Sequence, residues 1–253
     1  MNFGIIIQAR LSSQRLPNKV IKPILNERSI LDIIILRLKK ITPGFPIILA
    51  TGDNQKNNEL LSYASKYDIL FFSGSEDDVL DRFIQCAKKF KLRQVLRVCA
   101  DNPFLDYKLA EKIIAVSQQG NYDYVSYSVK NRPAILSHYG FFSEVVNCDT
   151  LAKAHLEIGS QSDKEHVTPY IYNHPERFSI RLEETPTKIV NEGNIRLTVD
   201  TEIDFQNASE ILRRLVAKHD FSYTFEDVLP LVKTMGNGLQ ERMTEQIILN
   251  SKS

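Results

Sequence analysis

Short apolar runs alternate with longer segments of helical periodicity over the first 130 residues. The apolar runs lie at about 3–9, 46–51, 69–72, 94–99 and 122–127. Between them, apolar residues recur at helical spacing, which predicts helices over 29–41, 56–66, 77–90 and 107–119. Strands joined by crossover helices lie parallel in one sheet. The sequence therefore predicts an α/β fold in which helices cover both faces of a mostly parallel sheet.

Beyond residue 130 the alternation becomes irregular. The patterns there predict strands at 135–148, 178–184 and 194–199 and helices at 160–175, 202–218 and 224–250. We predict one domain over residues 1–253. Within it, 128–190 is expected to be an insertion for substrate binding or dimerisation, and 221–253 a helical tail.

The bulk composition argues against several classes of protein. With a net charge of +1, the chain lacks the basic excess of a nucleic-acid-binding protein. No apolar stretch reaches the length of about 18 residues that a membrane span needs. Cys86, Cys99 and Cys148 are odd in number and lack zinc-ligand spacing, which predicts reduced thiols and a cytoplasmic protein.

The segment 5–20, IIIQARLSSQRLPNKV, is a strand-like run followed by a basic loop, and no acidic residue precedes Glu27. The loop follows the strand directly, so it should lie at the carboxyl edge of the sheet, where ligands bind. It has no glycine-rich phosphate motif, so side chains would have to hold an anion such as a triphosphate. The candidates are Arg10, Ser12, Ser13, Arg15 and Lys19. The alternative is a solvated basic loop.

Two aspartates follow predicted strands and should reach the same edge. Asp101 comes just after the strand at 94–99, and Asp200 just after the strand at 194–199. Mg²⁺ in phosphate sites takes one or two carboxylates together with phosphate oxygens and water. The pair therefore predicts a magnesium site beside the basic loop. The alternative for each residue alone is a turn or a helix cap.

A third loop, Ser73-Gly74-Ser75, follows a predicted strand and opens a helix. The acidic residues after it would repel phosphate, so the loop is expected to face the base or the ribose. Arg82, one turn into the helix, could point back to this site or remain on the surface.

The histidines give a weaker signal. His166, beside Glu165 in the insertion, could line a substrate pocket, whereas His155, His174 and His219 fit surface or packing roles. No histidine has the spacing of a nucleophilic triad or a local metal pair.

The motif ARLSSQRLPNK resembles the N-terminal signature of the sugar-activating cytidylyltransferases. This family includes CMP-Kdo synthetases, CMP-sialic acid synthetases and the SpsF-like spore coat polysaccharide proteins. The resemblance is closest to the SpsF-like group and spans roughly residues 3–210. Segments that match in order are GSEDDVLDRFIQCAKKF, VLRVCADNPFLD, KEHVTPYIYNHPERF and RLTVDTEIDF.

The resemblance implies a Rossmann-like nucleotidyltransferase fold, CTP as the nucleotide, Mg²⁺ as the metal and a homodimer. Carried over by position, the nucleotide-binding residues are Ala9, Arg10, Ser12, Ser13, Arg15, Lys19, Gly74, Ser75 and Arg82. The metal would be held by Asp101 and Asp200, which with Arg10 and Lys19 form the catalytic set. Glu144, Glu165 and His166 fall where the family binds its sugar.

One departure bears on the acceptor. SpsF-like proteins often carry Leu-Asp where this chain has Phe141-Phe142, which predicts a more apolar acceptor pocket or another acceptor. The leading interpretation is transfer of CMP from CTP to a sugar acid, with release of pyrophosphate, in surface glycan biosynthesis. The alternatives are a phosphate or phosphonate acceptor, which gives a CDP-linked product, and a non-catalytic nucleotide-binding protein.

Overall fold

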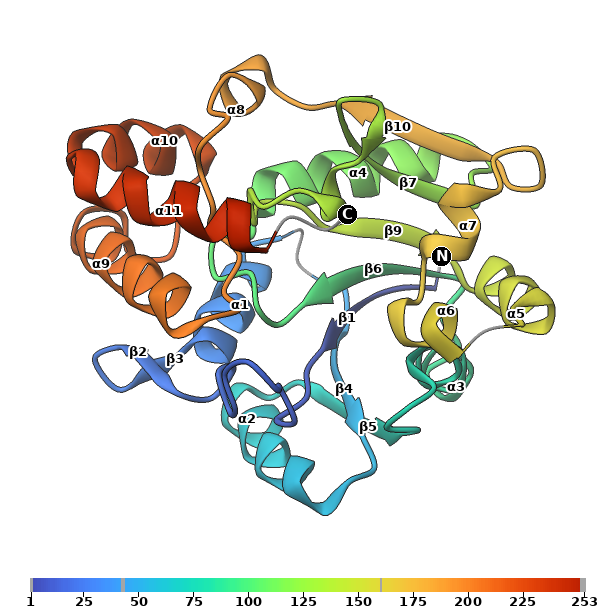
Figure 1. Cartoon of the computed structure of the whole chain (residues 1–253). Coiled ribbons are helices and arrows are strands. Elements are labelled where there is room, and N and C mark those ends of the chain that lie inside the picture. Colours follow the sequence, from blue (N-terminus) through green and yellow to red (C-terminus); the bar gives the residue numbers. More distant parts are fainter. Residues whose placement is uncertain (1, 42–43, 160, 251–253) are drawn as a thin grey trace.

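A mixed β-sheet forms the centre of the molecule in a computed structural model that describes residues 2–41, 44–159 and 161–250 (Figure 1). Among these residues, eight strands pair in the order β10-β7-β9-β6-β1-β4-β5, with β8 beside β7. They are β1 (Phe3–Gln8), β4 (Ile47–Gly52), β5 (Leu70–Gly74), β6 (Gln94–Cys99), β7 (Tyr124–Val129), β8 (Arg132–Pro133), β9 (Glu144–Asn147) and β10 (Ile180–Glu184).

The central strands β6, β1, β4 and β5 are parallel, and β10 is parallel to β7. Only β8 and β9 run antiparallel to their neighbours in this sheet. A small hairpin of β2 (Pro23–Leu25) and β3 (Arg28–Ser29) stands apart from it. The predicted mostly parallel sheet is therefore confirmed.

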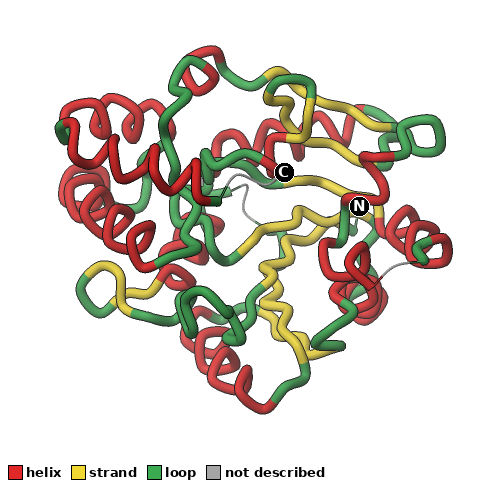
Figure 2. Tube along the Cα trace, viewed as in Figure 1, coloured by secondary structure: helices red, strands yellow, loops and turns green. Residues whose placement is uncertain are grey.

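Alternating side chains give the sheet two buried faces. In β1, Ile5 and Ile7 join one core cluster and Ile6 joins the other, as the two-residue period of a strand requires. The larger cluster packs against α1, α2, α4, α9, α10 and α11, and the smaller one against α3, α5 and α7. Figure 2 shows the helices on both sides of the sheet, as the sequence predicts.

The structure describes eleven α-helices, of which the first four follow the predicted periodic segments closely. They are α1 (Ile30–Leu38), α2 (Leu60–Tyr67), α3 (Val79–Lys89), α4 (Tyr107–Gln119), α5 (Cys148–Glu157), α6 (Gln161–His166), α7 (Pro169–Asn173), α8 (Thr187–Val190), α9 (Glu202–His219), α10 (Phe225–Thr234) and α11 (Asn237–Leu249). Two 3₁₀ helices are η1 (Gln55–Glu59) and η2 (Ala134–Leu136). None of the described helices is both long and apolar enough to span a membrane.

Four predictions about elements are wrong in part or whole. The strand expected at 194–199 is an extended segment outside the sheet, because Leu197 N donates to His138 O and Val199 N to Asp101 O instead of to a strand. The strand expected at 135–148 is reduced to β9, since the segment before it is irregular. The helix expected at 224–250 is two helices, and Gly236 between them has a left-handed φ of 88°.

The helix expected at 160–175 is also divided, into α6 and α7. Residue 160 lies outside the described residues, and α6 begins at Gln161. Pro169 begins α7, where its missing N–H costs no helical hydrogen bond.

Candidate active site

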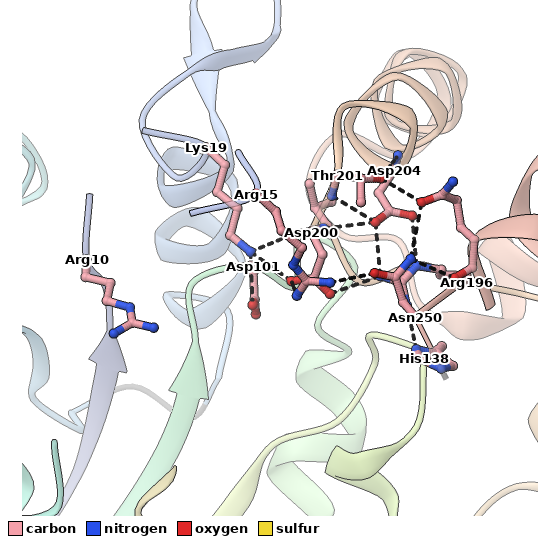
Figure 3. Close-up of polar contacts among 12 residues, drawn as sticks. Arg10, Arg15, Lys19, Asp101, His138, Arg196, Asp200, Thr201, Asp204 and Asn250 are labelled. Carbon is pink, nitrogen blue, oxygen red and sulfur yellow. Dashed lines mark hydrogen bonds and ion pairs between the residues drawn. The ribbon is translucent and has the colours of Figure 1, made fainter. Parts of the chain in front are cut away.

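The site lies at a topological switch point of the sheet. From the central strand β1 the chain moves to β4 on one side, and it later returns as β6 on the other. In such a sheet a crevice opens outside the carboxyl ends of the strands. Arg10 follows β1 and Asp101 follows β6, so both predicted site residues stand at this crevice (Figure 3).

The ammonium of Lys19 joins the two predicted metal-binding aspartates. Lys19 is only 8% exposed, and its Nζ donates to Val199 O at 2.6 Å. The same nitrogen lies 3.1 Å from Asp200 Oδ1 and 3.4 Å from Asp101 Oδ2. Tertiary structure thus brings together three residues that are far apart in the sequence (Figure 3).

Asp200 is surrounded by cations. In addition to Lys19, Arg15 Nη2 lies 3.0 Å from Oδ1 and Arg196 Nη2 lies 3.0 Å from Oδ2. Burial raises the pKa of Asp200, but the charges of Lys19 and Arg15, the Lys19 hydrogen bond and the charge of Arg196 together lower it below its usual value. The carboxylate is therefore ionised at neutral pH and available as an oxygen ligand.

Arg196 orients Asp200 and was missed by the sequence analysis. It is 2% exposed, and its Nε donates to Asp204 Oδ1 at 2.8 Å. Its Nη1 lies 2.6 Å from His138 Nδ1, which must accept because a guanidinium can only donate. The available signal was an arginine inside the apolar run NIRLTV, four residues before Asp200.

Asp204 completes this arrangement from the first turn of α9. Its carboxylate forms a capping box with Thr201, the residue that follows Asp200. Asp204 Oδ2 also accepts the backbone N–H of Asp200 at 3.0 Å. The start of α9 therefore holds the backbone on both sides of the Asp200 side chain.

Arg10 stands apart from the Lys19 cluster, at the end of β1 (Figure 3). Its Nη2 forms an ion pair of 2.9 Å with Glu165 Oε1, and both side chains are 44% exposed. The pair joins the first loop to α6, where His166 is exposed. The structure thus brings the predicted triphosphate residue Arg10 next to the predicted acceptor residue Glu165.

The other residues of the first loop occupy different environments. Ala9 is buried, and its backbone N–H donates to Ala50 O at 3.2 Å. Ser12 is exposed and Ser13 is half-buried. Ser12 Oγ donates to Glu76 Oε1 at 2.9 Å, which ties the first loop to the loop after β5.

Glu76 links the loops after β1, β4 and β5. Its Oε2 accepts from Asn57 Nδ2 at 2.8 Å, and a Cβ placed at Gly52 would lie 1.6 Å from this oxygen. Gly52 therefore leaves the space in which the carboxylate lies. Neither Asn57 nor Gly52 carried a signal in the sequence, because each acts through a partner from another loop.

Arg82 supports the predicted base-binding loop from inside the protein. It is 1% exposed, and it donates from Nε to Ser75 O at 2.9 Å and from Nη2 to Glu76 O at 3.0 Å. Gly74 ends β5, and a Cβ added to it would lie 3.1 Å from Arg82 Cγ. This burial does not fit the prediction that Arg82 contacts the base or ribose, because its guanidinium donates hydrogen bonds to two carbonyl oxygens of the loop.

Glu144 is fully buried, which does not fit the prediction that it contacts the acceptor. Arg97 Nη1 lies 2.6 Å from its Oε2, and Thr168 Oγ1 donates to both oxygens at 3.2 Å. Tyr124 Oη also donates to it. Glu144 instead balances the buried charge of Arg97, whose Nη2 lies 3.1 Å from Gln8 Oε1 at the end of β1.

Phe141 and Phe142 are core residues. They are 0% and 3% exposed, and Phe142 packs against Tyr127 while Phe141 packs against Phe225. Because neither ring reaches the surface, this burial does not fit the prediction that they make the acceptor pocket more apolar. The alternative, another acceptor, stays a prediction.

Asp101 and Asp200 are the groups best placed to hold a cation. Among the described residues, no group of three or more His, Cys, Asp and Glu side chains could bind a metal ion. Nevertheless, the Asp101 and Asp200 carboxylates and the Val199 carbonyl surround the Lys19 ammonium, whose positive charge occupies the place that a metal ion could take. These hard oxygen donors fit Mg²⁺, which completes its coordination with phosphate oxygens and water.

Comparisons with known proteins identify the family of the chain. The sequence model of the cytidylyltransferase family matches residues 4–229. Spore coat polysaccharide biosynthesis protein SpsF of Bacillus subtilis is 31% identical over 222 residues, which cover 86% of this chain and 89% of SpsF.

Solved structures show the same fold. A cytidylyltransferase from Leptospira borgpetersenii superposes with a TM-score of 0.81 and 23% identity, over 100% of this chain and 99% of the other. A CMP:2-keto-3-deoxy-manno-octonic acid synthetase solved with CTP has a TM-score of 0.64 and 12% identity, over 85% of this chain and 99% of the other. The chain therefore belongs to the cytidylyltransferase family and is a nucleotidyltransferase of Rossmann-like fold.

Proposed function

We propose that this enzyme transfers CMP from CTP to a hydroxyl group of a sugar acid and releases pyrophosphate. The observation that carries the proposal is the meeting of Lys19, Asp101 and Asp200 beside Arg15 at the carboxyl edge of the sheet. The CTP bound to the structurally similar synthetase supports the choice of nucleotide. The name of SpsF supports a role in surface polysaccharide biosynthesis.

Triphosphate binding would exchange the partners of the loop cations. Arg10 is paired with Glu165, Arg15 with Asp200, and Lys19 with both aspartates. Phosphate oxygens accept charge-assisted hydrogen bonds at least as well as carboxylates do, and arginine binds them with two N–H groups. The bound triphosphate would thus replace Glu165 at Arg10 and add phosphate oxygens to the partners of Arg15 and Lys19.

Asp101 and Asp200 would hold Mg²⁺, for which their hard oxygens are suited. When bound, the ion supplies positive charge at the α-phosphate and lowers the pKa of the attacking hydroxyl. Arg196 keeps Asp200 in one orientation, because its guanidinium also binds the buried Asp204.

In the transfer step, the acceptor oxygen attacks the α-phosphorus in line with the leaving group. A new P–O bond forms as the bond to the β-phosphate breaks, and the electron pair leaves with pyrophosphate. Lys19, Arg10 and Arg15 stabilise the charge that develops on that group. The acceptor hydroxyl gives up its proton to solvent.

The acceptor is proposed to lie beside α6. Glu165 stands there next to Arg10, with His166 as the following residue of α6, and Glu165 becomes available when triphosphate takes its partner. We also propose a homodimer that works in the cytoplasm. The buried thiols of Cys86 and Cys148, neither in a disulfide, support a reducing compartment.

A pyrophosphate-release screen tests the function. CTP, ATP, GTP and UTP are each combined with a panel of sugar acids, and the product mass is measured. We expect turnover with CTP and a CMP-linked product. A CDP-linked mass would instead indicate a phosphate or phosphonate acceptor, and nucleotide binding without turnover on any acceptor would indicate a non-catalytic role.

Variants of the aspartates test the residue assignment. Asp101→Ala and Asp200→Ala should each abolish turnover while the far-ultraviolet circular dichroism of the fold is kept. If either variant retained near-normal turnover, that aspartate would not belong to the site.

A further inference from the structure

The C-terminal helix α11 reaches the nucleotide site although it lies beyond residues 4–229, which the family model matches. Figure 1 shows α11 running from α10 towards the middle of the sheet, across the front of α9. In the close-up, Asn250 at its end lies beside Arg15 and Asp200 (Figure 3). This segment therefore contacts residues of the site that the family match does not account for.

The helix is fixed firmly on α9. Leu239 and Met243 are 2% and 1% exposed, so they anchor its inner face in the core. Arg242 Nε donates to Asn207 Oδ1 at 2.8 Å, and its Nη2 lies 3.3 Å from Glu210 Oε2. The first half of α11 is thus held in place independently of the site.

Gln246 connects α11 to Thr201, the residue after Asp200. It is 4% exposed, and its Oε1 accepts from Thr201 Oγ1 at 2.9 Å. Thr201 follows Asp200 and is the N-cap of α9. The same Oε1 accepts from Asn250 Nδ2 at 3.3 Å, and this Nδ2 also donates to Gln246 O at 2.9 Å.

Asn250 in turn holds Arg15. Its Oδ1 accepts from Arg15 Nη1 at 2.6 Å, while Nη2 of the same guanidinium lies 3.0 Å from Asp200. The Arg15 side chain is 53% exposed and would otherwise sample many rotamers. Asn250 thus restricts the guanidinium to a position over the site before any ligand is bound.

We propose that Asn250 and Gln246 are positioning residues that preorganise Arg15 and Asp200 for the triphosphate. The inference rests on the proposed function, because it assumes that Arg15 binds phosphate. Ordering a long side chain in advance removes that cost from binding. Loss of Asn250 should therefore weaken triphosphate binding about two- to tenfold, raising KM for CTP more than it lowers kcat.

The test compares Asn250→Ala with Glu245→Ala, an exposed control on the same helix. Calorimetry measures the binding of inorganic tripolyphosphate and of CTP with Mg²⁺, and thermal unfolding checks the fold. Asn250→Ala should lower both affinities with an unchanged melting temperature, and Glu245→Ala should leave all three unchanged. Equal affinities for Asn250→Ala and wild type would overturn the proposal.

A double-mutant cycle separates positioning from a general structural effect. In the Arg15→Ala background, Asn250→Ala should have no further effect on tripolyphosphate affinity, because its partner is gone. An equal loss in both backgrounds would contradict the inference. Gln246→Leu should keep part of its effect in the Arg15→Ala background, since Gln246 also accepts from Thr201 beside Asp200.

These outcomes are distinct from failure of the proposed function. If the wild type bound tripolyphosphate but gave no turnover with any acceptor, the function would fall and the affinities would still decide the role of Asn250. If the wild type bound neither tripolyphosphate nor CTP, both proposals would be wrong.

Discussion

Lys19 contacts both aspartates of the proposed site. Its ammonium lies between Asp101 and Asp200, so one side chain both neutralises the carboxylates and offers a charge to phosphate. Removing it would take away the cation that Asp101 and Asp200 share in a half-buried setting.

Lys19→Met keeps the apolar stem and removes the charge. We expect kcat/KM for CTP to fall about 100- to 1,000-fold, as for other losses of a transition-state charge partner. Steady-state pyrophosphate release at varied CTP concentration measures it. Lys22→Met is the matched control, because the Lys22 ammonium contacts neither aspartate but forms an exposed ion pair with Glu202 and lies over the Phe205 ring. If the two variants had equal activities, Lys19 would not belong to the site.

At the scale of elements, the segment before β9 supports the segment that carries Asp200. Gly140 has a φ of 69°, and a Cβ there would lie 2.9 Å from the backbone C and O atoms of Leu197. Leu197 N also donates to His138 O at 2.8 Å. The two segments are therefore packed backbone to backbone, three residues before Asp200.

Gly140→Ala should destabilise the protein by about 1–2 kcal/mol from the left-handed backbone alone. The clash with Leu197 should add to this cost and displace Asp200, so turnover should fall as well. Urea unfolding and the pyrophosphate assay measure the two effects. Gly193→Ala is the control, since its added Cβ would meet no atom within 4 Å. A fully active and stable Gly140→Ala would show that this contact is unimportant.

The start of α1 makes stability depend on pH through Asp32. Burial raises its pKa, but hydrogen bonds from Lys66, Tyr67 and Ser29 lower it below the usual 3.8. A carboxyl whose pKa is lower in the folded state stabilises the fold above the unfolded value. This contribution is lost as the pH falls through the folded pKa.

Asp32→Asn should therefore reduce the free energy of unfolding at pH 7, by about 1.5–3 kcal/mol for a lost charged hydrogen bond. The difference from wild type should shrink as the pH is lowered below 3.8. Urea titrations at several pH values measure it, and a difference that stays constant with pH would contradict the assignment.

At the scale of the whole molecule, the reactivity of two buried cysteines measures how often the protein unfolds. Cys86 on α3 and Cys148 on α5 lie in the smaller core cluster. Burial raises the pKa of both thiols to about 12, so few thiolates exist near neutral pH.

Iodoacetamide at pH 8 should label Cys86 and Cys148 only as fast as the molecule unfolds. Tripolyphosphate should slow labelling further, because a ligand that binds the folded state stabilises it. Mass spectrometry of peptides over time gives both rates. Rapid labelling of the two residues in the native protein would mean that this core opens locally.

The periodicity of the chain was sufficient to predict the sheet and most helices. Ser29 caps the N-terminus of α1 in a capping box. The same reasoning failed at 194–199, because an apolar extended segment looks like a strand whether or not a neighbouring strand pairs with it. It also predicted one helix over 224–250, since the amphipathic pattern continues across the break at Gly236.

The sequence by itself determined the fold class and the placement of Arg10 and Asp101 after central strands, because these follow from local periodicity. Only the tertiary structure decided which charges meet. It put Lys19 between Asp101 and Asp200, turned Arg82 inward and brought Asn250 to Arg15. The physical reason is that burial patterns repeat locally, whereas ion pairs depend on how closely segments distant along the chain approach one another.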